Sequence, residues 1–238
     1  MRKFNVLVIS LFVSIFSYGQ IKSKTEPLES FSKVVVGPHI EVKFKKSNEE
    51  SIELSEMKIS RDNIVIKNTS GKLEIFLKDA RYLSKTSKVD DKNIPIYDGT
   101  ILTVQLNYKN ITKAVVRSRE KFFIDHISGE RFKLKLYGSP SFEISNLKVD
   151  KFTTKIYGES QLNVLSGSTI EQKLKIYGKN EVLLGNNNDQ SRIYSFGNNE
   201  IEAKVSKKIK LTSLGELELE NRGEAEIKKF FSFAEKKE

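Results

Sequence analysis

Basic and aromatic side chains recur at a fixed spacing in the second half of this chain. The segments 131–138, 151–158 and 171–178 read RFKLKLYG, KFTTKIYG and EQKLKIYG. In each segment a Lys lies two positions before a Tyr, and the Tyr immediately precedes a Gly. If the three segments lie side by side, these residues form a cationic column beside an aromatic one. The candidate ligand-binding residues are Lys135, Tyr137, Lys155, Tyr157, Lys175 and Tyr177.

Two interpretations of these columns follow from their chemistry. Aromatic rings beside ammonium groups suit sugar rings with anionic substituents, so the columns could bind a polysaccharide. Alternatively, Tyr137, Tyr157 and Tyr177 stack on one another and only stabilise the fold, since aromatic pairs contribute about 0.5–1.5 kcal/mol each. The sequence leaves both interpretations open.

A longer repeat positions these residues. Glycines follow one another at short and nearly constant intervals, and a fixed period of this kind is typical of stacked repeat architectures. The marking glycines are Gly138, Gly158, Gly178, Gly197 and Gly215. A weaker copy centred on Ser118 lies one period upstream of the first, which gives six repeats.

Alternation of apolar and polar residues around each glycine predicts β-strands with one buried face. At the fourth position before the glycine the inward residues are Leu134, Thr154, Leu174, Ile193 and Leu211. At the fourth position after it they are Phe142, Leu162, Val182, Ile201 and Leu219. One repeat cannot bury these side chains alone, so the repeats must stack in parallel. We therefore predict an all-β solenoid over residues 111–230.

Residues 31–110 are predicted to form β-strands that cap this solenoid. Alternation indicates strands at 31–36 and 40–44, an antiparallel pair at 63–66 and 72–77, and a strand that buries Leu102, Val104 and Leu106. The polar segment 78–99 is predicted to be a surface loop. Residues 231–238 are assigned to a charged tail.

The N-terminal residues 1–19 have the features of a signal peptide. Arg2 and Lys3 precede an apolar run at 6–16, and Ser17 and Gly19 suit a cleavage site before Gln20. The run is too short to span a bilayer, and no other run of that length exists. Residues 20–30 are expected to be a leader. We expect an exported protein without a transmembrane segment, located in the periplasm, on the cell surface or in the medium.

The net charge suggests which partners the mature chain would attract. The formal charge is +10 and becomes +8 once the two basic residues of the signal peptide are removed. For an exported protein this favours acidic glycans or another negatively charged envelope component over nucleic acid. The alternative is that the charge only confers solubility.

No pattern in the sequence indicates catalysis or a cofactor. Glu143 and Glu159 are isolated, and His39 and His126 are the only histidines and lie far apart. We therefore expect no enzyme activity, no cofactor and no metal site. Two alternatives remain: a polysaccharide-processing enzyme on a parallel β-helix, or a scaffold that binds another envelope protein through a strand edge. The oligomeric state stays open.

Several segments together resemble a known family. The opening stretch 31–44 (FSKVVVGPHIEVKF), the stretch 71–77 (GKLEIFL), Leu102-Thr-Val104 and the glycine-marked repeats are similar to the head GIN domain of auto-transporter adhesins. This resemblance implies a right-handed parallel β-helix-like solenoid in an exported envelope protein of Bacteroidetes-type bacteria. The family has no established biochemical role and implies no catalytic residues.

Overall fold

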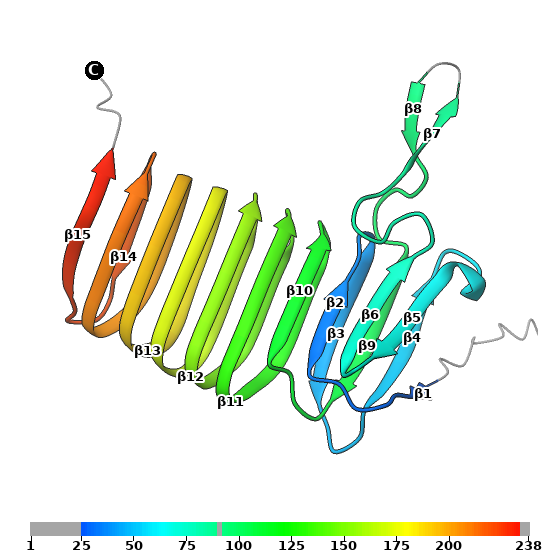
Figure 1. Cartoon of the computed structure of the whole chain (residues 1–238), viewed down its shortest axis with the longest axis horizontal. Coiled ribbons are helices and arrows are strands. Elements are labelled where there is room, and N and C mark those ends of the chain that lie inside the picture. The colour runs from blue at the N-terminus through cyan, green and yellow to red at the C-terminus, as the bar shows by residue number, and fades with distance from the viewer. Residues whose placement is uncertain (1–24, 90–91, 234–238) are drawn as a thin grey trace, which may run out of the picture.

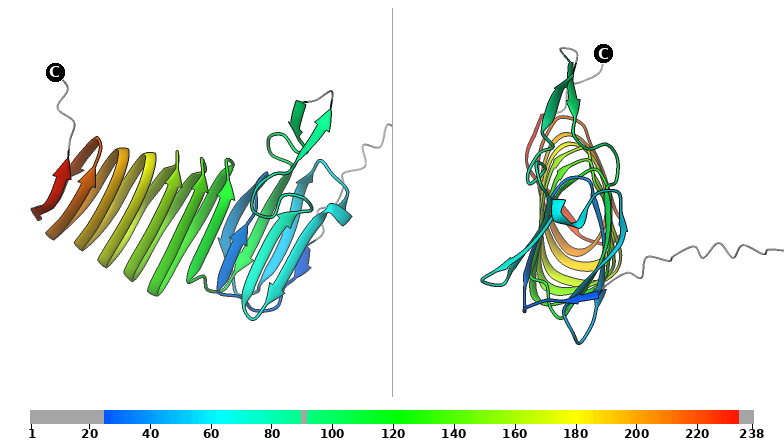
Figure 2. Two further views of the ribbon diagram at one scale, coloured as in Figure 1. Left: turned by 45° about the horizontal axis from the view of Figure 1, so that its top comes forward. Right: turned by 90° about the vertical axis from the view of Figure 1, so that its right-hand side faces the viewer.

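The protein is an all-β rod that carries a curled mixed sheet at its N-terminal end (Figures 1 and 2). The computed structural model describes residues 25–89 and 92–233. The predicted signal peptide, the first part of the leader and the end of the charged tail lie outside these residues. The only helical element in the described part of the chain is the 3-10 turn η1 (Arg61–Asn63).

The predicted repeats wind into a β-solenoid of about six turns, here called rungs. Strands β10 (Lys113–Ser118), β11 (Lys121–Gly138) and β12 (Ser141–Gly158) pair in parallel with one another in that order. Strand β13 (Gln161–Leu214) winds through several further rungs, and β14 (Leu217–Asn221) and β15 (Glu226–Phe233) pair with it in parallel. The parallel stacking predicted from the repeat is confirmed. The right-handed sense stays a prediction.

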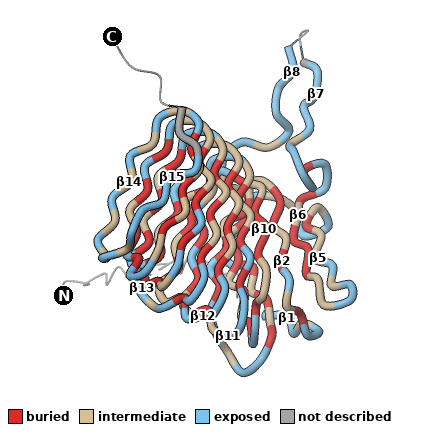
Figure 3. The backbone as a smooth tube through the Cα atoms, turned by 60° about the vertical axis from the view of Figure 1, so that its left-hand side comes forward, coloured by how far each residue is buried: buried red, intermediate tan, exposed pale blue. Residues whose placement is uncertain are grey.

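In-register pairing places equivalent residues of successive rungs next to each other. Leu134 pairs with Thr154, which pairs with Leu174, each one repeat further along the chain. The predicted inward positions are buried, except that Leu219 is only partly buried. Figure 3 shows the resulting alternation of buried and exposed residues along each rung. Burial of these columns is the main force that stabilises the rod.

Later rungs replace some apolar core residues with polar ones that bond to each other. Asn180 accepts a hydrogen bond from the Ser160 backbone N–H through Oδ1 (2.9 Å). Asn199 Oδ1 accepts from the Asn180 backbone N–H (3.1 Å) and from Asn180 Nδ2 (2.9 Å). This asparagine ladder satisfies backbone groups at the corner, which explains how buried amides are tolerated there.

The N-terminal region contributes rungs of its own as well as a cap. Strands β2 (Lys33–Val36) and β3 (Ile40–Lys46) do not pair with each other; β2 pairs in parallel with β10, and β3 with β11. On their other side, β6 (Lys72–Leu77) pairs in parallel with β2, and β9 (Leu102–Tyr108) with β3. The opening strands are therefore held between rungs that come later in the chain.

Antiparallel strands end the rod beyond β6 and β9. Strand β5 (Ile64–Thr69) pairs antiparallel with β6, as predicted, while β4 (Ser51–Met57) pairs antiparallel with β9 and β1 (Thr25–Pro27) with β4. The polar segment between β6 and β9 contains a hairpin, β7 (Thr86–Val89) and β8 (Lys92–Pro95), which projects from the rod (Figure 1).

The repeated glycines are required by a close approach between rungs. Gly158 has φ +125°, and a Cβ on it would lie 2.1 Å from the carbonyl oxygen of Gly138. A Cβ on Gly178 would lie as close to the carbonyl oxygen of Gly158, and a Cβ on Gly197 as close to that of Gly178. A side chain here would both strain the backbone and push the rungs apart.

We predict that Gly158→Ala destabilises the fold by roughly 3 kcal/mol or more, because strain and a backbone clash add. Gly129→Ala is the matched control, since Gly129 has a similar φ of +133° but open space around its Cβ position. It should cost only about 1–2 kcal/mol. Urea unfolding measures both variants, and equal losses would contradict the role assigned to the close approach.

Candidate functional site

The six candidate residues lie on one face of the solenoid in three adjacent strands. Lys135 on β11 pairs with Lys155 on β12, which pairs with Lys175 on β13. The tyrosines follow the same register, from Tyr137 through Tyr157 to Tyr177. All six side chains are half-buried. The two columns predicted from the sequence are therefore present.

The rings of the aromatic column cover one another's faces. The Tyr137–Tyr157 and Tyr157–Tyr177 centroids are 5.1 and 4.9 Å apart, with interplanar angles of 10° and 2°. Phe196 extends the column at 5.0 Å from Tyr177. At the other end Arg117 lies over Tyr137, with its Cζ 4.3 Å from the ring centroid. No ring face between two rungs is free for a sugar, so the aromatic column offers a ligand only ring edges and Tyr hydroxyls.

The cationic side chains extend further than the sequence analysis predicted. Position by position in register, the column that begins on β6 and ends on β13 consists of Lys72, Lys33, Lys113, Lys133, Thr153 and Lys173. Beside it lie Lys135, Lys155 and Lys175. We call these eight lysines the basic face: Lys33, Lys72, Lys113, Lys133, Lys135, Lys155, Lys173 and Lys175. Apart from Lys72, none of them forms an ion pair within the described residues.

The crowding of like charges affects the pKa of Lys113. Burial lowers the pKa of Lys113, and repulsion from the neighbouring Lys135, Lys33, Lys133 and Lys72 lowers it further. The free energy of the folded protein is therefore raised whenever Lys113 is charged.

One carboxylate lies at the N-terminal end of this face. Glu74 accepts from Lys72 (3.2 Å) and from Arg81 (3.1 Å). Burial alone would raise the pKa of Glu74, but these two cations lower it below its usual value. Because Glu74 is already paired, it does not neutralise the lysines further along the rod.

Lys33 and Lys72 were missed because their partners are not one repeat period away, whereas Lys113 lies one period before Lys133 and was simply not assigned to the column. Lys33 pairs with Lys113 on one side and with Lys72 on the other, and both separations in sequence exceed the period of the repeat. A signal was present: the stretches 33–36 and 113–116 read KVVV and KAVV. A search for similar stretches that did not assume a fixed separation would have placed Lys33 and Lys113 in one column.

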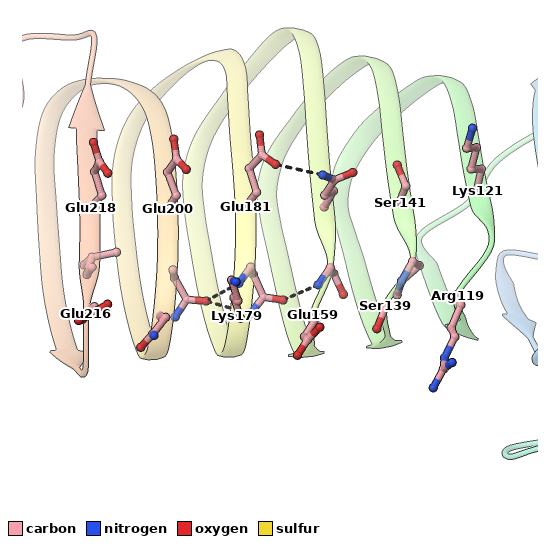
Figure 4. Close-up of a pocket in the computed structure, with 17 residues that line it drawn as sticks. Arg119, Lys121, Ser139, Ser141, Glu159, Lys179, Glu181, Glu200, Glu216 and Glu218 are labelled. Carbon is pink, nitrogen blue, oxygen red and sulfur yellow. Dashed lines mark hydrogen bonds between the residues drawn. The ribbon is translucent and has the colours of Figure 1, made fainter.

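A hollow lies along another part of the rod surface, away from the basic face. Its end nearest the C-terminus is lined by acidic side chains. It has a volume of about 890 Å³, and its floor includes the asparagine ladder. Figure 4 shows Glu181, Glu200 and Glu218 in one row on successive rungs, followed by Ser141 and Lys121 towards the N-terminal side. Neither of the two histidines lines this hollow. Among the described residues, no group of three or more His, Asp or Glu is placed to hold a metal ion.

Tyr157 tests the aromatic column, because its ring contacts a Tyr on each side. We predict that Tyr157→Ala lowers the free energy of unfolding by about 1–3 kcal/mol, the sum of two ring contacts. Tyr157→Phe keeps both contacts and should leave stability nearly unchanged. Thermal unfolding distinguishes the two variants, and an unchanged midpoint for Tyr157→Ala would show that the column does not stabilise the fold.

Lys113 tests the crowding of positive charge. We predict that Lys113→Gln raises the thermal midpoint at neutral pH and low salt, because it removes repulsion among the lysines. Since the pKa of Lys113 is lowered by folding, the repulsion disappears as the pH rises through its titration, and the gain should shrink there. Added salt should also reduce the gain. A lower midpoint for the variant at low salt would contradict the crowding.

Similar folds occur in solved structures at low sequence identity. The chain is similar to a putative lipid binding protein from Parabacteroides distasonis, with 13% identity, a TM-score of 0.59 and coverage of 89% of this chain and 93% of that chain. A putative adhesin from Bacteroides fragilis has 11% identity and a TM-score of 0.59, with 87% and 96% covered. A putative adhesin from Parabacteroides merdae has 15% identity and a TM-score of 0.50, with 89% and 97% covered. At these identities the likeness shows the fold alone.

Sequence comparison gives the family. No curated protein matches the chain. The family described as "Putative auto-transporter adhesin, head GIN domain" matches residues 30–225, which include the opening strands and nearly all of the rungs. An auto-transporter adhesin family implies export, and the described residues contain no helix long and apolar enough to cross a membrane. The chain belongs to this head GIN domain family.

Proposed function

We propose that this protein is a non-catalytic binding module of the cell envelope or cell surface, and that its basic face binds an anionic polysaccharide. The observation that carries the proposal is the in-register series of lysines on neighbouring strands, from β6 to β13. The aromatic column beside it supports the fold and adds Tyr hydroxyls as hydrogen-bonding groups.

The stability of the fold does not account for these lysines. Like charges directly opposite each other on neighbouring strands are destabilising. The same column holds Thr153 between Lys133 and Lys173, so an uncharged residue fits this position. A bound polyanion would offset the repulsion, and the arrangement is therefore better explained by binding than by folding.

The geometry favours an extended polymer over a small ligand. Neighbouring strands lie about 4.8 Å apart, so the lysines present positive charges at regular intervals along the rod. A chain of acidic sugars laid along the strand-stacking direction could contact several rungs at once. Such multivalent contact raises affinity without requiring a deep pocket.

The open end of the rod favours a second candidate function. Within the described residues, β14 and β15 pair only with β13, so each leaves an outer strand edge without a partner. Phe230 on β15 is 67% exposed. An unpaired edge with exposed apolar side chains can accept a strand of another protein, which fits a scaffold that binds an envelope protein. Pull-down from envelope extracts with and without residues 226–233 tests this candidate; equal capture of every protein would exclude it.

We predict that the triple variant Lys135→Gln, Lys155→Gln, Lys175→Gln binds polygalacturonate at least about tenfold more weakly than the unchanged protein, a loss of about 1.4 kcal/mol. The wild-type affinity should fall steeply with added salt, because the contacts are between charges at the protein surface that salt can screen. Isothermal titration calorimetry measures both effects, with neutral dextran as the ligand control.

The matched control removes three exposed lysines elsewhere: Lys58→Gln, Lys148→Gln, Lys204→Gln. It changes the net charge by the same amount and should retain most of the binding. Equal losses in the two triple variants would show that net charge, and not the basic face, determines binding. No binding of polygalacturonate by the wild-type protein would overturn the proposed function.

A further inference from the structure

A small hollow opens next to the basic face. It lies at the corner of the solenoid that the chain passes just before it enters the strand segments of that face. Its volume is about 190 Å³. Its lining comes from consecutive rungs and consists of Lys151, Phe152, Thr153, Glu171, Gln172, Lys173, Gln190, Ser191, Arg192, Lys208 and Lys210. Lys173 belongs both to this lining and to the basic face.

The hollow arises from a change in the core column behind it. Phe132 and Phe152 stack in this column with their centroids 6.1 Å apart. The next rung places Gln172 in register with Phe152, and Gln172 Nε2 lies 3.5 Å from the hydroxyl of Ser191. Ser191 is much smaller than Phe152. The core column therefore loses side-chain volume at Ser191, and the surface is indented there.

The walls of the hollow carry unneutralised positive charge. Its one carboxylate, Glu171, is paired with Lys151 at 3.5 Å. None of the remaining cationic side chains forms an ion pair with a described residue; they are Lys173, Arg192, Lys208 and Lys210. This charge suits an anionic group, and the guanidinium of Arg192 has the planar geometry that binds a carboxylate through two hydrogen bonds.

The base of the hollow has neutral polar groups with unused hydrogen-bonding capacity. Gln172 is buried, with 3% of its surface exposed, and its Oε1 accepts no hydrogen bond. A buried acceptor without a partner costs about 1–3 kcal/mol. This oxygen is enclosed, so a ligand hydroxyl reaches it only when the Gln172 side chain turns towards the hollow, and the resulting hydrogen bond would remove that cost.

We propose that this hollow is a subsite for one uronic-acid residue of the bound polysaccharide. The sugar carboxylate pairs with Arg192, Lys173 and Lys210, while a sugar hydroxyl donates to Gln172. This inference rests on the proposed function and adds a ligand class to it: the protein prefers carboxylated polymers over sulfated polymers of similar charge. The rest of the polymer then lies along the lysines of the basic face.

Two variants test the subsite separately from the basic face. Ser191→Phe puts a large side chain back into the core column beyond Gln172 and fills the hollow while every charge is kept. Arg192→Gln removes the carboxylate-binding fork and leaves the hollow open, so it remains informative if the Phe is not accommodated in the core. Arg131→Gln is the control, because Arg131 is an exposed arginine of another rung that does not line the hollow.

Calorimetric titration with polygalacturonate, dextran sulfate and monomeric galacturonate gives the readout. We expect wild type to bind polygalacturonate more tightly than dextran sulfate. In both subsite variants the ratio of the two affinities should fall about tenfold. Arg131→Gln should keep it. The monomer should bind weakly and compete only at the hollow.

The outcomes separate the two proposals. If polygalacturonate binds through the basic face but neither subsite variant changes the preference, the subsite is wrong and the proposed function stands. If wild type binds neither polymer, both proposals fail. If galacturonate alone binds as tightly as the polymer, the hollow is a small-carboxylate site and its assignment to a polymer is overturned.

Discussion

The structure depends on parallel pairing of strands in register at a short, nearly constant sequence period. Because each residue lies next to its equivalent in the following rung, any residue type that the repeat preserves becomes a column. Leucines and isoleucines give a continuous core, as in the series Leu136, Ile156 and Ile176. Glycines allow the corners to approach closely, and asparagines bond to each other and to backbone groups. Few interactions connect distant parts of the rod, so its stability is largely a sum of neighbouring contacts.

The same register has opposite consequences for different side chains on the surface. Stacking of aromatic rings stabilises the fold, as in the column from Tyr137 to Phe196. The guanidinium of Arg117 covers the ring face at the N-terminal end of this column. The same alignment of lysines destabilises the fold, because their charges repel each other and the neighbouring surface supplies few carboxylates. The stability of the fold explains the aromatic column but not the lysines, which is why we propose that the lysines bind a partner. This difference decides which of the predicted residues we assign to binding.

Much of the fold could be predicted from the sequence, because it follows from two short sequence periods. The alternation along each strand identifies the inward positions, and the longer period of the repeat aligns one rung with the next. The position of β2 and β3 could not be predicted in this way, because their partners are the later strands β6, β9, β10 and β11. Their place depends on tertiary pairing between segments that lie far apart in the sequence.

The candidate site was predicted in part for the same reasons. Lys135, Lys155 and Lys175 follow directly from the repeat, and so does the alignment of Lys113 with Lys133. The alignment of Lys33 and Lys72 with Lys113 depends on the long-range pairing. The sequence showed where the tyrosines would align but not that their faces would be covered, which depends on ring orientation. The smaller hollow depends on the volume lost between Phe152 and Ser191 in a core column that alternation alone did not identify.

The central claim is that a polyanion lies along the in-register lysines. Lysine acetylation followed by mass spectrometry, with and without polygalacturonate, tests this most directly because it reports each side chain separately. We predict that Lys135, Lys155 and Lys175 become protected together, whereas Lys148 and Lys204 react as before. Equal protection of all five lysines, or protection of Lys148 and Lys204 alone, would contradict the claim.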